Sequence, residues 1–570
     1  MMLDQTKHSK NILLGFLAVW LIINLIQASF MDLHPDEAYY WLYSKFLAWG
    51  YFDHPPMVAL FIKIGDTLTH TPLGLRLVTV ISTTTAFFLL WKVVAEYTRN
   101  PKLFILLSCS IVLFHVYGFI TTPDSPLFFF TALFLYVYQR YLKQDSYLTA
   151  VILALVIACL LYSKYHAILL LFFTILSNFK LFKRPSFWVI ILFAITAFLP
   201  HLWWQYQNDF PSFYYHIIDR SAEAYRFEFT YQYIAGQLLL AGPLVGWYLY
   251  SAASKSKSED DFIKALRFNF FGIFIFFLLS TFKGRVEAHW TLPAMICLML
   301  LAYLQLAKHG VPKWFTKVAL INISLIIIAR LILIIPIPIL QKNKFINSYF
   351  GTKEWALAIH RHAGDRPVIF ENSFQQPSRY NYYTNSTKGF AYNSRDYRKN
   401  QYDIWPLDDQ IRNKTAYYIM LQPDPARKLD TILTNKGVEY ATWLNDVRMY
   451  QRVDVEVLNL PGQIKSNTQI NLKLKITNPY TDTITLRNKG QKWKCFLEYG
   501  YRVDSKLIEP MAPVTVDLEA KLILPGQSII IPAVINLPKL PGKYKLEFSI
   551  RTEPFIGSRN SSRITVEVAK

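Results

Sequence analysis

The amino-acid sequence predicts a polytopic α-helical membrane protein with a folded tail outside the membrane. Of its 570 residues, 53% are hydrophobic and 16% are aromatic, which is too apolar for an ordinary soluble enzyme. The apolar residues concentrate before about residue 340, in runs close to the roughly 20 residues that a membrane-spanning helix needs. The composition turns polar after that point. We therefore expect a membrane domain at residues 1–340 and soluble domains at residues 341–570.

The apolar runs predict about eleven membrane-spanning helices, of which the first is retained and is not a cleaved signal peptide. They lie near residues 12–30, 76–95, 103–120, 126–142, 148–163, 167–180, 187–203, 232–251, 267–282, 290–307 and 317–338. Lysine and arginine cluster in alternate connections, so the positive-inside rule makes those connections cytoplasmic.

The extracytoplasmic side then receives the reactive residue types. Its segments are the first loop (31–75), the turns 121–126, 163–166 and 283–290, the loop 204–231 and the whole tail. Most aspartate, glutamate and histidine residues of the membrane domain fall there. Any loop is expected to contain polar residues, but this does not explain why aspartate, glutamate and histidine are concentrated on one side of the membrane.

Charge and cysteine content exclude two other classes of protein. The net charge is +21, but the basic residues of the membrane domain form short clusters between apolar runs, which is typical of topology signals. Three of the four cysteines lie in apolar runs and Cys495 is alone in the tail, so no disulfide framework or cysteine-rich metal site can form. We expect neither a nucleic-acid partner nor redox chemistry.

The first extracytoplasmic loop contains closely spaced carboxylates and histidines. The segment HPDE (34–37) opens an aromatic-rich helical stretch, and YFDHPP (51–56) breaks it. Pro35 suits the first position of a helix, and the helix dipole favours an ionised Asp36 that can accept a proton. An acidic first turn is also, by itself, an ordinary helix start.

Four segments in this order resemble the polyprenyl-phosphate-dependent glycosyltransferases, a family that includes protein O-mannosyltransferases and lipid A aminoarabinose transferases. They are DE (36–37), GYFDHPP (50–56), TTPDSPL (121–127) and WWQYQNDFPSFYYHIIDR (203–220). The resemblance covers roughly residues 10–340. It implies the C-type membrane fold, an active site between the membrane and the outer loops, and a sugar donor carried on polyprenyl (undecaprenyl) phosphate in a bacterial inner membrane.

By position, the resemblance assigns catalytic roles to Asp36, to its neighbour Glu37 and to Asp124. The chemistry agrees, because displacing a phosphate from a sugar carbon needs a base for the acceptor hydroxyl and positive charge on the departing phosphate. Asp36 would be that base, and one clear base without a second nucleophile predicts inversion at the sugar carbon. Without the resemblance, Asp124 would be interpreted as an ordinary turn residue.

The basic residues of the outer loops are candidates for contact with the donor phosphate. The strongest are Arg220, Lys283 and Arg285, since arginine can donate two parallel hydrogen bonds. Each also has a simpler explanation. Arg220 could pair with Asp219 or Glu223, and the other two could mark a membrane boundary.

Histidine adds further candidates. The resemblance pairs Asp53 with His216 as holders of a divalent metal in some members, but one carboxylate and one imidazole are a thin ligand set, so a metal is a tentative expectation. Where relatives have a lysine, this chain has His54, which would contact phosphate only when protonated. Lys164 and His166 could touch a lipid phosphate, although capping a tight turn is the slightly better interpretation.

The tail predicts two domains. Residues 341–452 suggest a small α/β domain with helical segments at 353–362 and 426–437, strands at 367–371 and 416–421, and a tyrosine-rich stretch at 379–384. Residues 453–570 alternate short strands with turns, which predicts an immunoglobulin-like β-sandwich. Tyr380, Tyr382 and Trp405 are candidates for acceptor contact or for the core.

The leading hypothesis is a hexosyl- or pentosyl-type transferase that moves a sugar from polyprenyl phosphate to a lipid, glycan or protein acceptor. A transporter or flippase of lipid-linked sugars should show ionisable or helix-breaking residues near the bilayer midplane and internal repeats, and neither pattern is clear. A non-catalytic receptor or scaffold would leave the carboxylates unexplained.

Overall fold

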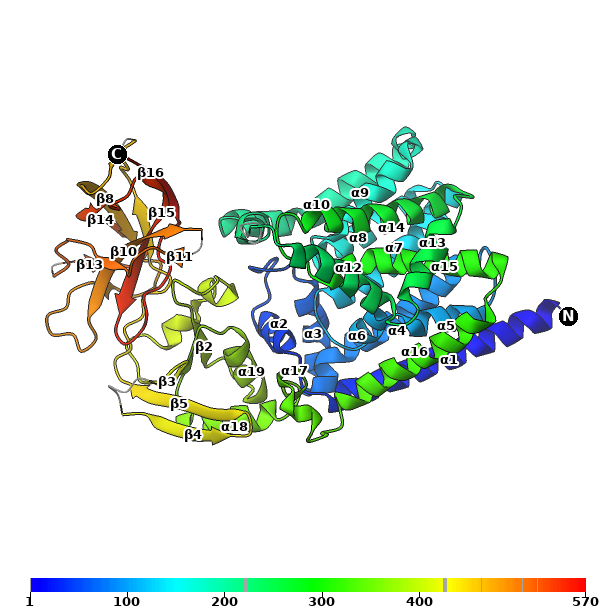
Figure 1. Cartoon of the computed structure of the whole chain (residues 1–570), viewed down its shortest axis with the longest axis horizontal. Helices are drawn as coiled ribbons and strands as arrows, with labels where there is room; N and C mark the ends of the chain where they lie inside the picture. Colours follow the sequence, from blue (N-terminus) through cyan, green and yellow to red (C-terminus); the bar gives the residue numbers. More distant parts are fainter. Residues whose placement is uncertain (1, 220–223, 424–427, 463, 505, 520) are drawn as a thin grey trace. The chain divides into compact units, whose positions relative to one another are not determined.

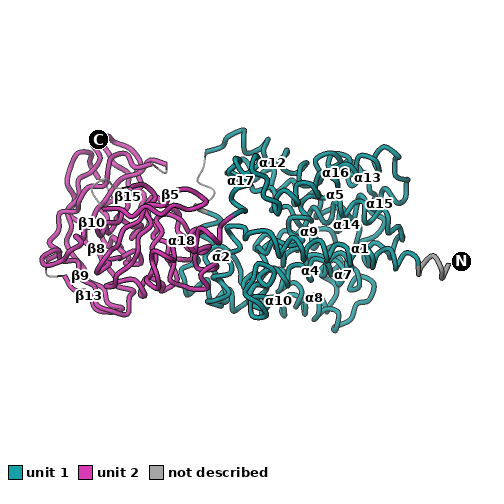
Figure 2. The backbone as a smooth tube through the Cα atoms, turned by 90° about the horizontal axis from the view of Figure 1, so that it is seen from below, with its two compact units in different colours: residues 1–350 teal, residues 351–570 magenta. Residues whose placement is uncertain are grey.

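A computed structural model of the chain divides into two compact units, Met1–Phe350 and Gly351–Lys570 (Figures 1 and 2). The structure describes residues 2–219, 224–423, 428–462, 464–504, 506–519 and 521–570. The first unit is helical, and the second contains all the described strands.

The helices of the first unit follow the apolar runs of the sequence. They are α1 (Met2–Phe30), α2 (Pro35–Lys45), α3 (Met57–Leu68), α4 (Pro72–Val94), α5 (Pro101–Ser110), α6 (Val112–Tyr117), α7 (Asp124–Lys143), α8 (Tyr147–Ser163), α9 (Ala167–Ser177), α10 (Pro185–Gln207), α11 (Pro211–Phe213), α12 (Phe227–Ala241), α13 (Gly246–Lys255), α14 (Asp261–Ser280), α15 (Leu292–His309), α16 (Lys313–Ile332) and α17 (Lys344–Asn347). Short 3-10 or π segments are η1 (Phe179–Lys183), η2 (Tyr214–Asp219), η3 (Ala288–Thr291) and η4 (Leu340–Lys342). Among the described residues, six helices are long and apolar enough to cross a membrane, namely α1, α4, α10, α14, α15 with η3, and α16.

Two predicted spans each consist of two helices, α5 with α6 and α12 with α13. The second break lies at Gly242, whose φ of 126° is a conformation that glycine adopts without steric cost. Asn322 of α16 serves both breaks, because it donates to the Ser110 carbonyl at 2.9 Å and accepts from the Leu244 N–H at 3.1 Å. A polar side chain thereby satisfies backbone groups that an interrupted helix leaves open.

Helix α15 forms the centre of the first unit. Its residues from Leu292 to Tyr303 are all buried, against apolar side chains of α4, α5, α7, α13 and α14. A helix that is apolar around its whole circumference is expected to be enclosed on all sides. The remaining helices pack around it and carry the outer loops at their ends.

Arg330 is a buried charged residue of the helical bundle. Arg330 of α16 donates to the side-chain oxygens of Asn24 at 2.9 Å and of Gln27 at 3.4 Å, both on α1. It also lies 3.3 Å from Nδ1 of His115 on α6. These neutral partners satisfy the guanidinium and tie the ends of three helices together.

The N-terminal part of the second unit is an α/β domain. Its elements are α18 (Thr352–Ala363), β1 (Val368–Glu371), α19 (Gln375–Tyr383), β2 (Gly389–Tyr392), η5 (Gln401–Asp403), η6 (Pro406–Gln410), β3 (Ala416–Met420), β4 (Asp430–Thr434) and β5 (Gly437–Leu444). The sheet order is β2-β1-β3-β5-β4, in which β1 is parallel to both of its neighbours and β3, β5 and β4 are antiparallel.

Two details of this domain differ from the sequence interpretation. The segment predicted to be helical at 426–437 contains strand β4, because a turn at Asn435 and Lys436 returns the chain through Gly437 (φ 128°) into β5. Tyr380, Tyr382 and Trp405 are buried, so they belong to the interior and do not offer an acceptor surface.

The remaining strands form the C-terminal β domain, residues 453–570. They are β6 (Asp454–Val457), β7 (Ile464–Lys465), β8 (Gln469–Thr477), β9 (Ile484–Thr485), β10 (Cys495–Val503), β11 (Lys506–Leu507), β12 (Ala512–Pro513), β13 (Leu522–Ile523), β14 (Ser528–Asn536), β15 (Gly542–Thr552) and β16 (Ile564–Ala569). One sheet runs β11-β10-β15-β16-β7 with β12 beside β10, a second runs β14-β8-β6, and β13 pairs with β9. Alternating side chains of the two larger sheets share one core.

Ion pairs join the α/β domain to the C-terminal β domain. Arg502 of β10 lies 2.6 Å from Asp396, and Arg395 lies 3.2 Å from Glu498 of the same strand. The Asp396 side chain is half exposed, while the three other side chains are largely buried. Contacts of this kind hold residues 351–570 together as one compact unit.

Candidate active site

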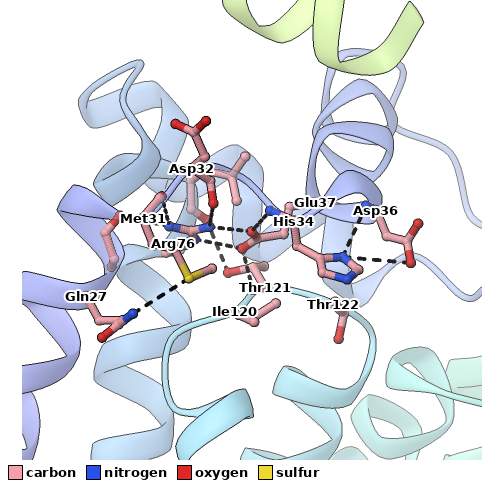
Figure 3. Close-up of polar contacts among 12 residues, drawn as sticks. Gln27, Met31, Asp32, His34, Asp36, Glu37, Arg76, Ile120, Thr121 and Thr122 are labelled. Carbon is pink, nitrogen blue, oxygen red and sulfur yellow. Dashed lines mark hydrogen bonds and ion pairs between the residues drawn. The ribbon is translucent and has the colours of Figure 1, made fainter. Parts of the chain in front are cut away.

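Asp36 lies in the first turn of α2, directly after Pro35, as the sequence predicts. His34 caps this helix, since its Nδ1 accepts from the Asp36 N–H at 3.3 Å and its own N–H donates to Glu37 at 2.9 Å. The Asp36 carboxylate remains 34% exposed and points away from Glu37 (Figure 3). It is therefore accessible to a reacting hydroxyl group.

Glu37, for which the resemblance predicts a catalytic role, lies in a buried hydrogen-bond network. Its side chain and that of Arg76 on α4 are both fully buried. Arg76 donates to the two carboxylate oxygens at 2.9 and 2.6 Å, and the N–H groups of His34 and Thr121 donate at 2.9 and 2.8 Å (Figure 3). Four donors leave this carboxylate no room for substrate, so Glu37 positions α2 against α4 and the turn at residue 121.

Arg76 was missed by sequence reasoning, although it is a single arginine near the outer end of an apolar run. Besides Glu37, it donates to the carbonyls of Ala28 at 3.0 Å, Met31 at 2.7 Å and Asp32 at 3.0 Å. An ionisable residue at such a position usually has a specific partner. Here the Arg76 guanidinium holds the end of α1 and the start of the first loop together through these hydrogen bonds.

Asp124 begins α7 and is held by Lys164 from the end of α8. The Lys164 Nζ lies 2.8 Å from each oxygen of the carboxylate, and both side chains are about 4% exposed. Nε2 of His289, which lies in η3, is 3.7 Å from the same carboxylate. Two side chains from distant parts of the sequence, Lys164 and His289, thus both lie close to Asp124. Lys164 is an ion-pair partner, which the turn-capping interpretation did not anticipate, and His289 was not singled out.

The buried side chain of Tyr40 is subject to the negative charge of three carboxylates. Burial and then the negative charges of Asp36, Asp53 and Asp124 raise the pKa of Tyr40 well above its usual value. The hydroxyl therefore stays protonated and able to donate a hydrogen bond. We call Asp36, Asp53 and Asp124 the carboxylate group.

Two basic side chains, Lys164 and His289, lie close to Asp124 of this group. His166, at the turn between α8 and α9, is buried, and burial followed by the charges of Lys164, His216, His289 and His54 lowers its pKa well below its usual value. The neutral His166 imidazole is thus close to four groups that are positive or can become so. We call Lys164, His54, His216 and His289 the basic cluster.

His54 lies where a contact to phosphate would be useful. Its ring centroid is 5.7 Å from that of Tyr40 and 6.2 Å from that of His216. It therefore connects the carboxylate group with the basic cluster. Its role toward phosphate stays a prediction.

His216 contacts the backbone of Asp53. The His216 Nε2 donates to the backbone carbonyl of Asp53 at 2.8 Å, so this nitrogen is engaged. Within the part of the chain that the structure describes, no three His, Cys, Asp or Glu side chains are grouped so that they could hold a metal ion. A divalent metal held by Asp53 and His216 therefore stays a prediction of the resemblance.

The remaining basic candidates are Lys283, Arg285 and Arg220. Lys283 and Arg285 are exposed in the connection between α14 and η3, and Arg285 Nε is 3.4 Å from Glu287. Arg220 lies outside the described residues. A contact of these residues with phosphate remains a prediction.

A close contact explains the glycine of the GYFDHPP segment. A Cβ atom at Gly50 would lie 2.4 Å from the Trp204 ring and 2.9 Å from the His201 ring. His201 donates to the Trp49 carbonyl at 2.7 Å and accepts from the Tyr165 hydroxyl at 3.0 Å. The segment that carries Asp53 and His54 is thus packed directly onto the end of α10.

Comparisons with known proteins identify sequences that are similar to this chain. A family model described as dolichyl-phosphate-mannose-protein mannosyltransferase matches residues 53–204. The lipid A galacturonosyltransferase RgtD of Rhizobium johnstonii is 23% identical over 384 residues, which are 63% of this chain and 79% of that protein.

Two solved structures share the fold. Crystal structures of ArnT from Cupriavidus metallidurans, in the apo state and bound to undecaprenyl phosphate, have TM-scores of 0.56 and 0.54 at 14% and 13% identity. The matches cover 76% and 75% of this chain and 98% and 97% of the ArnT chains. As its motifs predict, the chain is related to the polyprenyl-phosphate-dependent membrane glycosyltransferases and has their C-type fold.

Proposed function

We propose that this protein is a glycosyltransferase that moves a sugar from a polyprenyl phosphate to a hydroxyl group of an acceptor. The observation that carries the proposal is a partly exposed carboxylate, Asp36, in the same helical unit as the buried pair of Asp124 and Lys164, which His289 approaches to 3.7 Å. A base and a positively charged region are the two components that this reaction needs. The likeness to ArnT bound to undecaprenyl phosphate supports undecaprenyl phosphate as the lipid of the donor.

In the proposed reaction, Asp36 takes the proton of the acceptor hydroxyl as its oxygen attacks the first carbon of the sugar. The bond between this carbon and the phosphate oxygen breaks, and polyprenyl phosphate leaves. Lys164 stabilises the negative charge on the departing phosphate, and a histidine of the basic cluster does so when it is protonated. A single displacement inverts the configuration of the sugar carbon.

The acceptor and the sugar are proposed at the level of chemical class. The relative that acts on lipid A favours a lipid or glycan acceptor over a protein, and the sugar is a hexose or a pentose. Lys283, Arg285, Arg220 and His54 are proposed as further contacts to the donor phosphate.

The membrane arrangement is also part of the proposal. The one-sided distribution of carboxylates and histidines supports an active site on the extracytoplasmic face of a bacterial inner membrane. We also propose about eleven spans, two of which are the broken helices described above. The proposed extracytoplasmic tail ends in a β-sandwich, which the shared core of the two larger sheets supports.

The test is sugar transfer by purified protein in lipid nanodiscs, supplied with short-chain polyprenyl-phosphate sugars and a membrane extract. Asp36→Asn is expected to lower turnover about a hundredfold, the range for loss of a general base. The matched control is Asp32→Asn, whose carboxylate points to the other side of Arg76 (Figure 3). Equal activity of wild type and Asp36→Asn would remove Asp36 from the mechanism. Absence of transfer by folded protein that binds the donor would favour a flippase.

A further inference from the structure

The C-terminal β domain contains a polar cavity that the proposed reaction does not use. Its volume is about 450 Å³, within the range of roughly 300–1,000 Å³ that is typical of small-molecule sites. It lies where the start of β8 and the end of β14 meet the middle of β10. The chain between β11 and β12 forms a further wall.

Hydrogen bonds build the cavity before any ligand arrives. The Asn536 N–H donates to the Tyr499 hydroxyl at 2.9 Å, and the Tyr501 hydroxyl donates to the Asn536 carbonyl at 3.0 Å. The Leu537 N–H donates to the Thr468 carbonyl at 2.9 Å. The buried tyrosines therefore connect one wall to the other. Because these side chains are already ordered, ligand binding does not cost their conformational entropy.

The polar side chains that line this cavity are available to a ligand. Asn467, Gln469, Asn536, Glu509 and Lys539 are exposed, and their side chains make no hydrogen bond or ion pair with the described residues. Carboxamides donate and accept at once, as sugar hydroxyl groups do. One carboxylate and one ammonium group give the lining no net charge.

We propose that this cavity binds a short neutral oligosaccharide. A phosphate or another anion would require a net positive lining, and an apolar ligand would require a lining with few polar groups. The lining combines amides, one carboxylate, one ammonium group and tyrosine side chains. This mixture suits a ligand that presents hydroxyl groups in several directions. The C-terminal β domain is thereby a glycan-binding module on the same chain as the membrane domain.

The test is binding of maltotriose, cellotriose, chitotriose and mannotriose to the full-length protein. The protein is held in nanodiscs made without glycoside detergent, because a maltoside headgroup is itself a sugar ligand. Saturation-transfer NMR followed by calorimetry should show saturable binding of at least one trisaccharide, weakened at least about tenfold in Gln469→Ala. This loss corresponds to about one or two hydrogen bonds.

The matched control is Gln527→Ala, an exposed glutamine at the opposite end of β14, which should bind as wild type does. Asp36→Asn should also bind the trisaccharide unchanged, since a sugar in the membrane domain would respond to that variant. The proposal is overturned if none of the four trisaccharides binds or if Gln469→Ala binds as tightly as wild type. A loss in Gln527→Ala or Asp36→Asn, or binding of short peptides in place of sugars, would overturn it as well.

Discussion

The guanidinium of Arg76 and the carboxylate of Glu37 form an ion pair with two hydrogen bonds, and neither side chain is exposed (Figure 3). The two residues are 39 positions apart in the sequence. Asp36, the adjacent residue, remains accessible. Two neighbouring carboxylates thus differ in environment, which suits Glu37 to be an anchor and Asp36 to be the base that we propose. A general base has to be held at a defined position toward its substrate, and the buried pair supplies that rigidity.

Glu37→Gln should destabilise the folded protein by about 3–5 kcal/mol, because it leaves the Arg76 charge buried without its counter-charge. Thermal unfolding in nanodiscs, followed by size-exclusion chromatography, measures the change. Glu96→Gln is the control, since Glu96 and Lys143 form an exposed pair whose loss should cost less than about 1 kcal/mol. Similar unfolding temperatures for the two variants would contradict the anchoring role.

Lys164→Met should lower kcat/KM for sugar transfer about a hundredfold, while Lys283→Met should lower it by no more than about tenfold. The reason is burial, since Lys164 is about 4% exposed in the basic cluster and Lys283 is exposed on an outer loop. Steady-state kinetics with varied donor concentration measures both. A larger effect of Lys283→Met would place the departing phosphate at the connection between α14 and η3.

Lys164 and Asp124 should behave as one unit in a double-mutant cycle. Lys164→Met and Asp124→Asn each break the same buried pair, so the double variant should be less impaired than the sum of the two singles, with a coupling of about 1–3 kcal/mol in unfolding free energy. Chemical or thermal unfolding of the four proteins supplies the cycle. Additive effects would show that the pair contributes no coupling.

Ionisation of Asp66 should make the free energy of unfolding depend on pH in the acidic range. Burial acts to raise the pKa of Asp66, but hydrogen bonds from His70, Lys45 and Trp41 outweigh it and lower the pKa to about 2. A lowered carboxyl pKa contributes stability that is complete above about pH 4 and is lost as the pH falls toward 2, and the contribution is roughly 2 kcal/mol.

The check is the difference in unfolding temperature between wild type and Asp66→Asn, which should shrink between pH 6 and pH 3. Asp365→Asn serves as the control, because the Asp365 side chain is almost fully exposed and its difference from wild type should stay constant. A difference for Asp66→Asn that does not change with pH would refute the assignment.

Local patterns were sufficient for much of the fold. The start of α2 at His34 and Pro35 followed from residue types at adjacent positions, and the apolar runs predicted most of the long helices. The helix predicted at 426–437 was wrong, because its apolar spacing also suits a short strand and only pairing with β5 decides between the two.

The sequence by itself determined that this is a membrane protein with a folded tail, and it identified the outer segments that carry Asp36, Asp53, Asp124 and His216. Hydropathy, charge distribution and motif spacing are properties of neighbouring residues, so they can be evaluated without a fold. The folded chain was needed to show that Glu37 is buried against Arg76, that Lys164 pairs with Asp124, and that His216 donates to the Asp53 carbonyl. The physical reason is that the role of a charged group depends on its burial and on partners that arrive from distant parts of the chain.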